Sequence, residues 1–359
     1  MTYYLQLLAT LFNYWYICEN DYLVEEKTMA TIKDVSKLAG VSVATVSRYL
    51  NKNGYVSKEA GETIAEVIEK LNYRPNNIAR SLAGMKTATI GLMVPDILNP
   101  FFPELARSIE DAANEYGYTV MLCNTDNDSM KEQKYIDTLL QKQVDGIIIS
   151  SYTIKPEHLS SLQKQSIPVV LMDNVFSSDS VVSLTVENLR GGELAVEHLL
   201  TQGCSKIAHI CGPSTITSSR ERTAGYENVS RGTDWFTPSL IGYSDFTVKG
   251  GYSTMNELLA LHPDLDGVFA SNDLMAAGAL KALQEAGRNV PRDVKVVGFD
   301  GIGLEMMNPQ LSTIAQPISE LGKTAMDSLI GLIRNESGIL TNQVFPVTLI
   351  LKQSTMTEK

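Results

Sequence analysis

The sequence predicts an α/β protein in which a small, purely helical domain precedes a larger domain of parallel sheets. Two observations predict this class. Apolar residues recur with helical spacing within residues 29–86, and from residue 90 onward strand-like apolar runs alternate with amphipathic helical stretches. The 359 residues are 44% hydrophobic and 20% charged, which is enough for two or three globular domains.

Charge is distributed unevenly along the chain. The formal net charge is -11, so a uniformly basic nucleic-acid-binding surface is excluded. Residues 29–86 nevertheless carry nine Lys or Arg against five acids, whereas the segments on either side are acidic. A short basic segment ahead of a large acidic one indicates a nucleic-acid module joined to a second domain.

Motifs for catalysis and metal binding do not occur in the sequence. Without a Walker loop, a Gly-x-Ser-x-Gly or a His-Glu-x-x-His sequence, we expect neither enzymatic activity nor a cofactor. The four histidines do not pair at metal-ligand spacing, so no metal site is expected. The four cysteines form no Cys-x-x-Cys, which is typical of proteins of the reducing cytoplasm.

The first 28 residues differ from the rest of the chain. Their apolar run contains Gln6, Thr10 and Asn13, so it is too short and too polar to span a bilayer. It also makes a poor signal peptide, because no Lys or Arg precedes it. We interpret residues 1–28 as a leader outside the fold, with translation normally starting at Met29. A membrane-associating leader is the alternative.

The basic segment begins with the pattern of a helix-turn-helix. Thr31 and Asp34 form a capping box, and Gly40 is placed to end the helix that follows. Ser42 then caps a second helix over residues 43–50, after a connection of helix-turn-helix length. The exposed side of the second helix is left with polar residues that suit phosphate and guanine contacts: Thr45, Ser47, Arg48 and Asn51.

A third helix and a marginal fourth complete the basic segment. Ser57 caps the third helix, whose apolar stripe supports the first two and consists of Ile64, Val67, Ile68 and Leu71. Pro75 ends that helix, and residues 76–83 then form a short stretch closed by Gly84. Eight residues are too few for a stable isolated helix, so we expect this segment to be helical only when packed, as a switch element would be.

The acidic remainder predicts parallel sheets. Seven apolar runs are expected to be strands: residues 90–94, 119–122, 146–149, 169–172, 207–210, 267–270 and 294–299. Amphipathic stretches such as residues 104–116 and 274–286 lie between several of them. This alternation predicts sheets covered by helices, with a ligand site at the carboxyl ends of the strands.

Several motifs occur together in the order of one known family. They include residues 30–35, 40–48, 73–76, 99–102, 144–146, 222–226, 271–276, 297–300 and 313–317. From residue 30 to residue 351 the chain resembles the lactose/galactose-repressor (LacI/GalR-type) family of bacterial transcription regulators. Among the members of that family it looks most like the ribose operon repressors.

The resemblance implies the organisation of the whole molecule. It implies a leader over 1–28, a helix-turn-helix domain over 29–75, a hinge helix and linker over 76–87, and an effector-binding and dimerisation domain over 88–359. The last would have two lobes joined by three crossovers, like periplasmic sugar-binding proteins. A homodimer would bind a pseudo-palindromic operator and release it when effector moves the hinges. The tail after Leu351 has no leucine heptads, so we expect a dimer rather than a tetramer.

The resemblance also implies which residues contact DNA. Val43 and Ala44 would begin the reading helix, and Arg48 would read a guanine. Leu82 would wedge between base steps in the minor groove, although an ordinary apolar anchor is the alternative. The complete set of expected DNA-binding residues is Thr31, Ser42, Val43, Ala44, Thr45, Ser47, Arg48, Asn51, Asn76, Ala79, Arg80 and Leu82.

For the effector, the resemblance implies a small sugar held in the cleft. The expected pocket residues are Asn99, Phe101, Phe102, Arg220, Asn272, Asp300 and Gln316. Their carboxylate, guanidinium and amide groups suit sugar hydroxyls, and their aromatic rings suit the C–H face of a sugar ring. Core packing is the alternative for the two phenylalanines. Arg222, two residues past Arg220, is instead a candidate for a structural salt bridge, and Asp273 is expected to be a helix cap rather than a ligand contact.

One departure from the sugar-binding pattern keeps other effectors open. An acid often follows the third strand in such proteins, whereas Ser150, Ser151 and Tyr152 follow it here. The alternatives to a ribose-type effector are a sucrose-responsive repressor and a global catabolite regulator gated by a phosphorylated carrier protein. A secreted sugar-binding protein would fit the α/β part but not the helix-turn-helix, and no membrane partner is expected.

Overall fold

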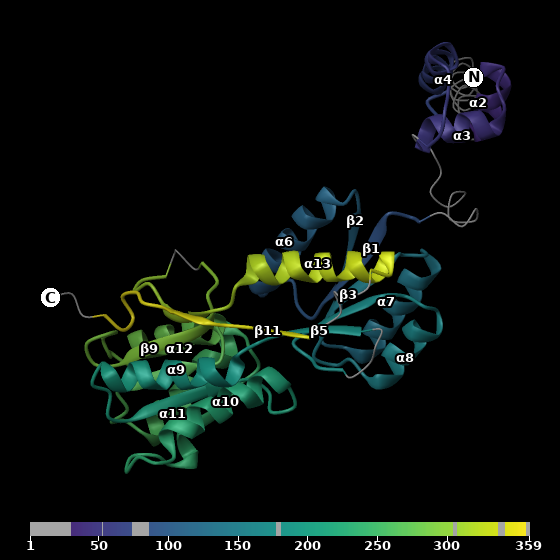
Figure 1. Cartoon of the computed structure of the whole chain (residues 1–359). Coiled ribbons are helices and arrows are strands. Elements are labelled where there is room, and N and C mark those ends of the chain that lie inside the picture. The colour runs from purple at the N-terminus through teal and green to yellow at the C-terminus, as the bar shows by residue number, and fades with distance from the viewer. Residues whose placement is uncertain are drawn as a thin grey trace, which may run out of the picture. The chain divides into compact units, whose positions relative to one another are not determined.

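The computed structural model describes residues 30–51, 53–73, 86–176, 181–303, 307–336 and 342–356. The leader and the hinge residues 76–83 lie outside this part of the chain. The chain divides into two compact units, Met1–Met85 and Lys86–Lys359 (Figure 1). The predicted class is confirmed, because the described part of the first unit is helical and the second combines parallel sheets with helices.

The first unit contains three described helices, α2 (Ile32–Ala39), α3 (Val43–Asn51) and α4 (Lys58–Lys70). The predicted capping box is present: Thr31 N donates to the Asp34 carboxylate at 2.8 Å, and Asp34 N donates back to Thr31 Oγ1. Gly40 ends α2 with a φ of 65°, a left-handed conformation that glycine adopts without strain. Val35 and Ile64 are fully buried between the helices, so α4 supports α2 and α3 as its apolar stripe predicts.

The second unit has two six-stranded sheets. The strands of the first are β1 (Thr89–Val94), β2 (Thr119–Asn124), β3 (Gly146–Ser150), β4 (Val169–Met172), β5 (Val181–Val186) and β11 (Gln343–Phe345). The strands of the second are β6 (Ile207–Cys211), β7 (Ile241–Tyr243), β8 (Gly267–Ala270), β9 (Lys295–Asp300), β10 (Ser312–Ala315) and β12 (Thr348–Ile350). Six of the seven predicted apolar runs fall within strands, and the seventh, residues 294–299, begins one residue before β9. The prediction missed β5, β7, β10, β11 and β12, of which β7, β11 and β12 have three residues each.

Strand order shows how the lobes are connected. The orders are β11-β5-β4-β3-β1-β2 in the first lobe and β12-β10-β9-β8-β6-β7 in the second, and all neighbours are parallel except β10 and β12. The chain therefore passes between the lobes three times, after β5, after β10 and after β11, as the family resemblance implies. Residues next to these crossovers lie between the two sheets, where a ligand cleft is expected.

Helices cover both faces of each sheet, because parallel neighbours require long crossovers. The first lobe carries α6 (Phe101–Glu115), α7 (Ser129–Gln141), α8 (Pro156–Lys164) and α13 (Ile318–Arg334). The second carries α9 (Asn188–Thr201), α10 (Thr217–Ser230), α11 (Val248–Leu261), α12 (Asp273–Glu285) and the short turn η1 (Pro238–Leu240). Within the described residues, no helix has both the length and the apolar character that crossing a bilayer requires.

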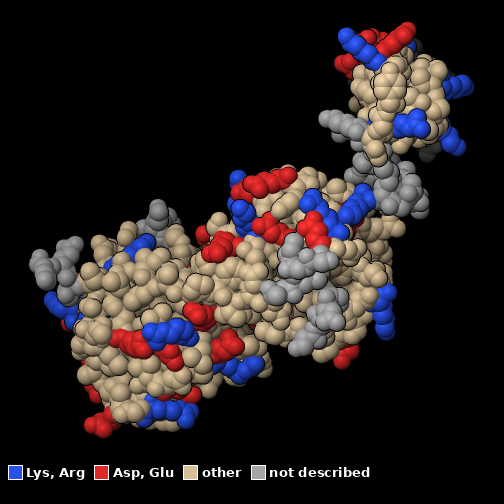
Figure 2. Space-filling view, in the orientation of Figure 1, with Lys and Arg blue, Asp and Glu red and all other residues tan. Residues whose placement is uncertain are grey.

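Charged side chains lie on the surface of both units. Figure 2 shows basic and acidic side chains on the visible face of the small helical unit, and both signs are also mixed over the core. The basic balance of residues 29–86, nine Lys or Arg against five acids, is a property of the sequence and favours nucleic-acid binding.

The second lobe contains a buried histidine that makes its stability depend on pH. His209 is stacked between Tyr226 and Phe269, with ring centroids 5.0 and 4.7 Å away. Burial lowers the pKa of His209 from 6.5 to about 4. Because the pKa of His209 is lower in the folded protein than in the unfolded chain, the buried neutral imidazole makes its full contribution to stability above pH 6.5. That contribution is lost as pH falls toward 4. The shift corresponds to a loss of about 3 kcal/mol.

Urea unfolding of the wild type and of His209→Gln at pH 7, 6, 5 and 4 checks this expectation. Glutamine does not titrate, so only the wild type should lose this contribution at low pH. The difference in unfolding free energy between the wild type and His209→Gln should therefore shrink as pH falls. A difference that stays constant over this range would show that His209 does not titrate in this way.

Candidate functional site

A cleft between the two lobes gathers polar and aromatic side chains at the carboxyl ends of the strands. The cavity left between these side chains has a volume of about 20 Å³, well below the usual range for ligand pockets, so the side chains lie close together here. The first lobe contributes Asn99, Phe101, Phe102, Tyr152 and Asp173. The second lobe and the segment that leaves it contribute Ser218, Arg222, Phe246, Asn272, Asp300 and Gln316.

Arg222 is a fixed positive charge in this cleft. Its Nε donates to Asn188 Oδ1 at 2.9 Å, and its Nη1 donates to the Ser271 carbonyl at 2.6 Å. The guanidinium also lies 3.6 Å from the centroid of the Phe299 ring, in a cation–π contact. These contacts from three elements hold the buried side chain in one position, with Nη1 3.4 Å from Asp300 Oδ1.

Two carboxylates face this guanidinium. Asp300 ends β9 with a φ of 107°, a strained conformation for a residue other than glycine, and accepts from Gln316 Nε2 at 2.8 Å. Burial raises the pKa of Asp300 to about 6, although Arg222 and Gln316 oppose the rise. Asp173 follows β4 and accepts from Ser150 Oγ at 3.3 Å, and burial raises its pKa too. The cleft therefore combines two carboxyl groups, whose charged forms burial disfavours, with one guanidinium in its described lining.

Gln316 leaves one strong acceptor unused. Its Oε1 is buried and has no hydrogen-bond partner among the described residues. A buried acceptor without a partner costs about 1–3 kcal/mol, so a ligand that donates a hydroxyl to it would recover that free energy.

Aromatic rings form one wall of the cleft. Phe101 and Phe102 meet edge to face at 5.2 Å, and Tyr152 lies 6.4 Å from Phe102. Tyr152 also lies 5.9 Å from Phe246, which belongs to the other lobe. The wall therefore crosses the boundary between the lobes and offers an apolar face beside the carboxylates, the combination that a sugar ring requires.

Six of the seven expected pocket residues line the cleft: Asn99, Phe101, Phe102, Asn272, Asp300 and Gln316. Arg220 does not. Its exposed side chain donates to the Thr215 carbonyl at 2.8 Å and to Thr217 Oγ1 at 3.1 Å, within its own turn. Residues two apart on a helix point in nearly opposite directions, so Arg222 and not Arg220 faces the cleft.

The expected capping role of Asp273 is wrong. Asn272 caps α12, since its Oδ1 accepts from Met275 N at 2.9 Å. Asp273 is fully buried and accepts from the backbone N–H groups of Gly301 and Ile302, each at 2.9 Å. It therefore fixes the turn after Asp300 rather than the start of its own helix.

Sequence reasoning missed Tyr152, Asp173, Ser218 and Phe246 as pocket residues and gave Arg222 a structural salt bridge rather than a place in the pocket. A signal existed for Asp173, which follows β4 directly, just as Asp300 closes β9. Ser218 and Arg222 lie four residues apart on α10, which places them on one helix face. Phe246 lies in the loop before α11, where no periodic pattern identifies it.

The expected DNA-contacting residues are placed in part. Val43, Ala44 and Arg48 are exposed on α3, and Ser42 Oγ accepts from Thr45 N at 3.1 Å as the cap of that helix. Thr31 is engaged in the cap of α2, and Ser47 is half-buried. The side chain of Asn51 and the four hinge candidates lie outside the described residues: Asn76, Ala79, Arg80 and Leu82.

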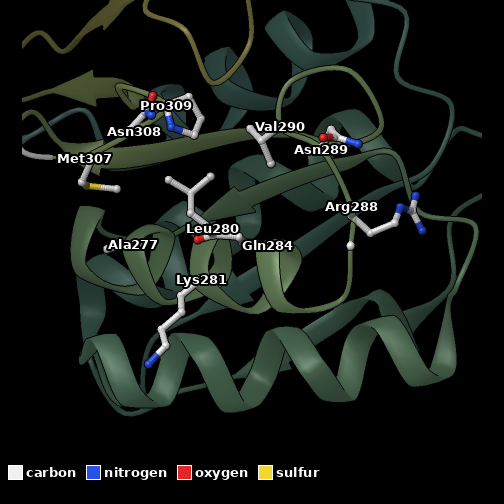
Figure 3. Close-up of a pocket in the computed structure, with 11 residues that line it drawn as sticks. Ala277, Leu280, Lys281, Gln284, Arg288, Asn289, Val290, Met307, Asn308 and Pro309 are labelled. Carbon is white, nitrogen blue, oxygen red and sulfur yellow. The ribbon is translucent and has the colours of Figure 1, made fainter.

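A second hollow lies on the surface of the second lobe, bounded by α12 and two loops. Figure 3 shows Leu280 and Val290 pointing toward one another there, while Lys281 points away. Among the described residues, its lining contains no carboxylate and no aromatic ring, the groups that recognise a sugar. The cleft between the lobes is therefore the better candidate for a ligand site.

Comparison with known proteins finds a matching family model for each of the two units. Residues 31–76 match the model of bacterial regulatory proteins of the lacI family, and residues 87–351 match that of periplasmic binding proteins and the sugar-binding domain of the LacI family. The ribose operon repressor of Halalkalibacterium halodurans is 44% identical over 91% of this chain and 97% of its own length.

Two solved structures extend the comparison. The lac repressor dimer bound to operator and the anti-inducer ONPF is 28% identical, with a TM-score of 0.81 over 91% of this chain and 99% of that one. A LacI family transcriptional regulator from Enterococcus faecium with bound ribose is 33% identical, with a TM-score of 0.68 over 76% of this chain and 100% of that one.

Proposed function

We propose that this chain, which belongs to the LacI family of bacterial regulatory proteins, represses a sugar-catabolic operon and releases its operator when a small sugar occupies the cleft. Proteins of this family are regulators rather than enzymes. The observation that carries the proposal is the cleft itself. A fixed guanidinium, two carboxylates, an unpaired amide oxygen and an aromatic wall are combined in one chain with a helix-turn-helix.

The charge of the cleft favours an uncharged, hydroxyl-rich effector. In the described lining, Asp173 and Asp300 can accept hydrogen bonds from hydroxyl donors, and one guanidinium, that of Arg222, is already engaged with Asn188, Ser271 and Asp300, so no free cation is left for a phosphate group. We assign ribose as the effector, because a curated relative at 44% identity is a ribose operon repressor and a structural relative holds ribose. The missing acid after β3 does not count against this assignment, since Asp173 after β4 supplies a carboxylate to the same cleft.

On the DNA side, the exposed positions of α3 support the assigned roles. Val43 and Ala44 present small side chains at the start of the helix, and the exposed Arg48 suits guanine recognition. We assign the hinge residues 76–83 to the minor groove, with Leu82 as the wedge. The chain would act in the cytoplasm, where a bacterial operator is found.

We assign the functional form as a homodimer, since a two-fold protein reads a pseudo-palindromic operator. One edge of the first sheet supports this assignment. Leu122 is exposed on the edge strand β2, and Leu98 and Met130, in the segments that follow β1 and β2, are 84% and 78% exposed. Exposed apolar side chains at a sheet edge favour association, and a second copy would cover them. The relative bound to operator is itself a dimer.

Calorimetric titration of the full chain with ribose, ribose 5-phosphate and sucrose tests the effector assignment. We expect saturable binding of ribose, and much weaker binding of the phosphosugar. Tight binding of sucrose alone would replace ribose with sucrose. If no sugar binds, a phosphorylated carrier protein becomes the better candidate for the signal.

Leu82→Ala is expected to weaken binding to the cognate operator while leaving ribose affinity unchanged. The reason is that an apolar wedge stabilises a kinked duplex without contacting the cleft. Fluorescence anisotropy with labelled operator, paired with ribose titration of the same preparation, measures both effects. Operator affinity equal to that of the wild type would rule out the wedge.

A further inference from the structure

A fully buried carboxylate lies in the first lobe, outside the lining of the cleft. Glu132, on α7, accepts from His158 Nδ1 at 2.6 Å through one oxygen. Its other oxygen accepts from the hydroxyls of Ser151 and of Thr153, the latter at 3.0 Å. Burying a carboxylate is unfavourable unless donors compensate it, so these three donors fix the loop after β3 against α7 and α8.

That loop carries a residue of the cleft. Ser151 and Thr153 flank Tyr152, whose ring forms the part of the aromatic wall that reaches Phe246 of the other lobe. The residues on both sides of Tyr152 thus donate a side-chain hydrogen bond to the same buried Glu132 carboxylate. Asn174 adds a further hydrogen bond to the loop, since its Nδ2 donates to the Ser151 carbonyl at 2.6 Å.

We propose that Glu132, paired with His158, is a positioning residue for the effector: it holds the turn over residues 151–153 so that Tyr152 presents its ring to the sugar. This proposal rests on the proposed function of the cleft. A purely structural pair would stabilise the lobe without acting through Tyr152, and that difference can be measured.

The first test needs no ligand. Tyr152→Trp places an indole in the wall of the cleft. The emission of the otherwise identical protein with Tyr152 is subtracted, and acrylamide quenching of the remaining emission then reports the exposure of the new indole. Adding Glu132→Met or Thr153→Val should raise the quenching constant about twofold or more, because each removes hydrogen bonds that hold the turn. Asp137→Asn, an exposed acid on the same helix, is the matched control and should change nothing. Unchanged quenching with Thr153→Val and with Glu132→Met would overturn the proposal.

The second test is a double-mutant cycle on ribose affinity. Glu132→Met and Thr153→Val should each weaken ribose binding about tenfold, as expected for lost hydrogen bonds to a buried charge. In a Tyr152→Ala background the same changes should have no further effect, whereas a structural role would give equal factors in both backgrounds.

The conservative Glu132→Gln should restore affinity to nearly the wild-type value. Its amide oxygen can accept from the two hydroxyls, and His158 can accept from the amide nitrogen as the other tautomer. Failure of this rescue would count against positioning. If the wild type binds no ribose, the proposed function fails while the quenching experiment still decides the role of Glu132.

Discussion

Arg222→Met is expected to weaken ribose binding about 10- to 100-fold, because a hydrogen bond from a charged donor contributes about 1.5–3 kcal/mol. The substitution removes the donors to Asn188 and Ser271 and the only guanidinium in the described lining of the cleft. Asp173 and Asp300 would then face each other without compensation, and the pKa of Asp300 would rise further. The operator should consequently stay bound when ribose is added.

Arg220→Met is the matched control for this prediction. The two arginines lie on the same helix, but Arg220 is exposed and donates only within its own turn. The ribose affinity of Arg220→Met, measured by calorimetry on the full chain, should stay within about twofold of that of the wild type, because exposed substitutions usually have small effects. The reverse outcome, with loss in Arg220→Met and normal binding in Arg222→Met, would contradict the geometry of the cleft.

Gly225→Ala is expected to lower the free energy of unfolding by about 2–3 kcal/mol, as overpacking at a tight contact does. A Cβ at this position would lie 2.1 Å from the Leu189 carbonyl oxygen, so α9 and α10 would have to separate. Those helices carry Asn188 and Arg222, whose hydrogen bond would lengthen. Weaker ribose binding should therefore accompany the loss of stability.

Gly232→Ala provides the comparison for Gly225→Ala, since a Cβ at Gly232 would meet nothing within 4 Å. Urea unfolding of both variants measures the effect, and Gly232→Ala should remain within about 0.5 kcal/mol of the wild type. Equal stability of the two variants would show that α9 and α10 tolerate separation.

Local patterns predicted those parts of the fold that depend on neighbouring residues. Thr31 with Asp34 and Ser42 with Thr45 form the predicted caps, and the apolar runs are strands, because both signals depend on a few adjacent side chains. Short strands such as β11 (Gln343–Phe345) were not predictable, since three residues carry no periodicity.

The cleft shows where sequence reasoning stops. Residues that directly follow or close a strand, such as Asp300, could be assigned from position alone. Whether Arg220 or Arg222 faces the cleft depends on the rotation of α10 about its axis, which the packing of Gly225 against Gly192 of α9 determines. Tyr152 and Phe246 come together only because two separate lobes face each other, and nothing local in either loop encodes that meeting.

Operator affinity with and without ribose tests most directly the central claim that sugar in the cleft switches DNA binding. The measurement is fluorescence anisotropy of the full chain and of Asp300→Ala on an operator selected from random-sequence duplexes. We predict that ribose weakens operator binding by the wild type about tenfold or more, the usual size of such coupling. Asp300→Ala should bind the operator equally well with and without ribose. A wild type indifferent to ribose, or a normal response from Asp300→Ala, would contradict the account.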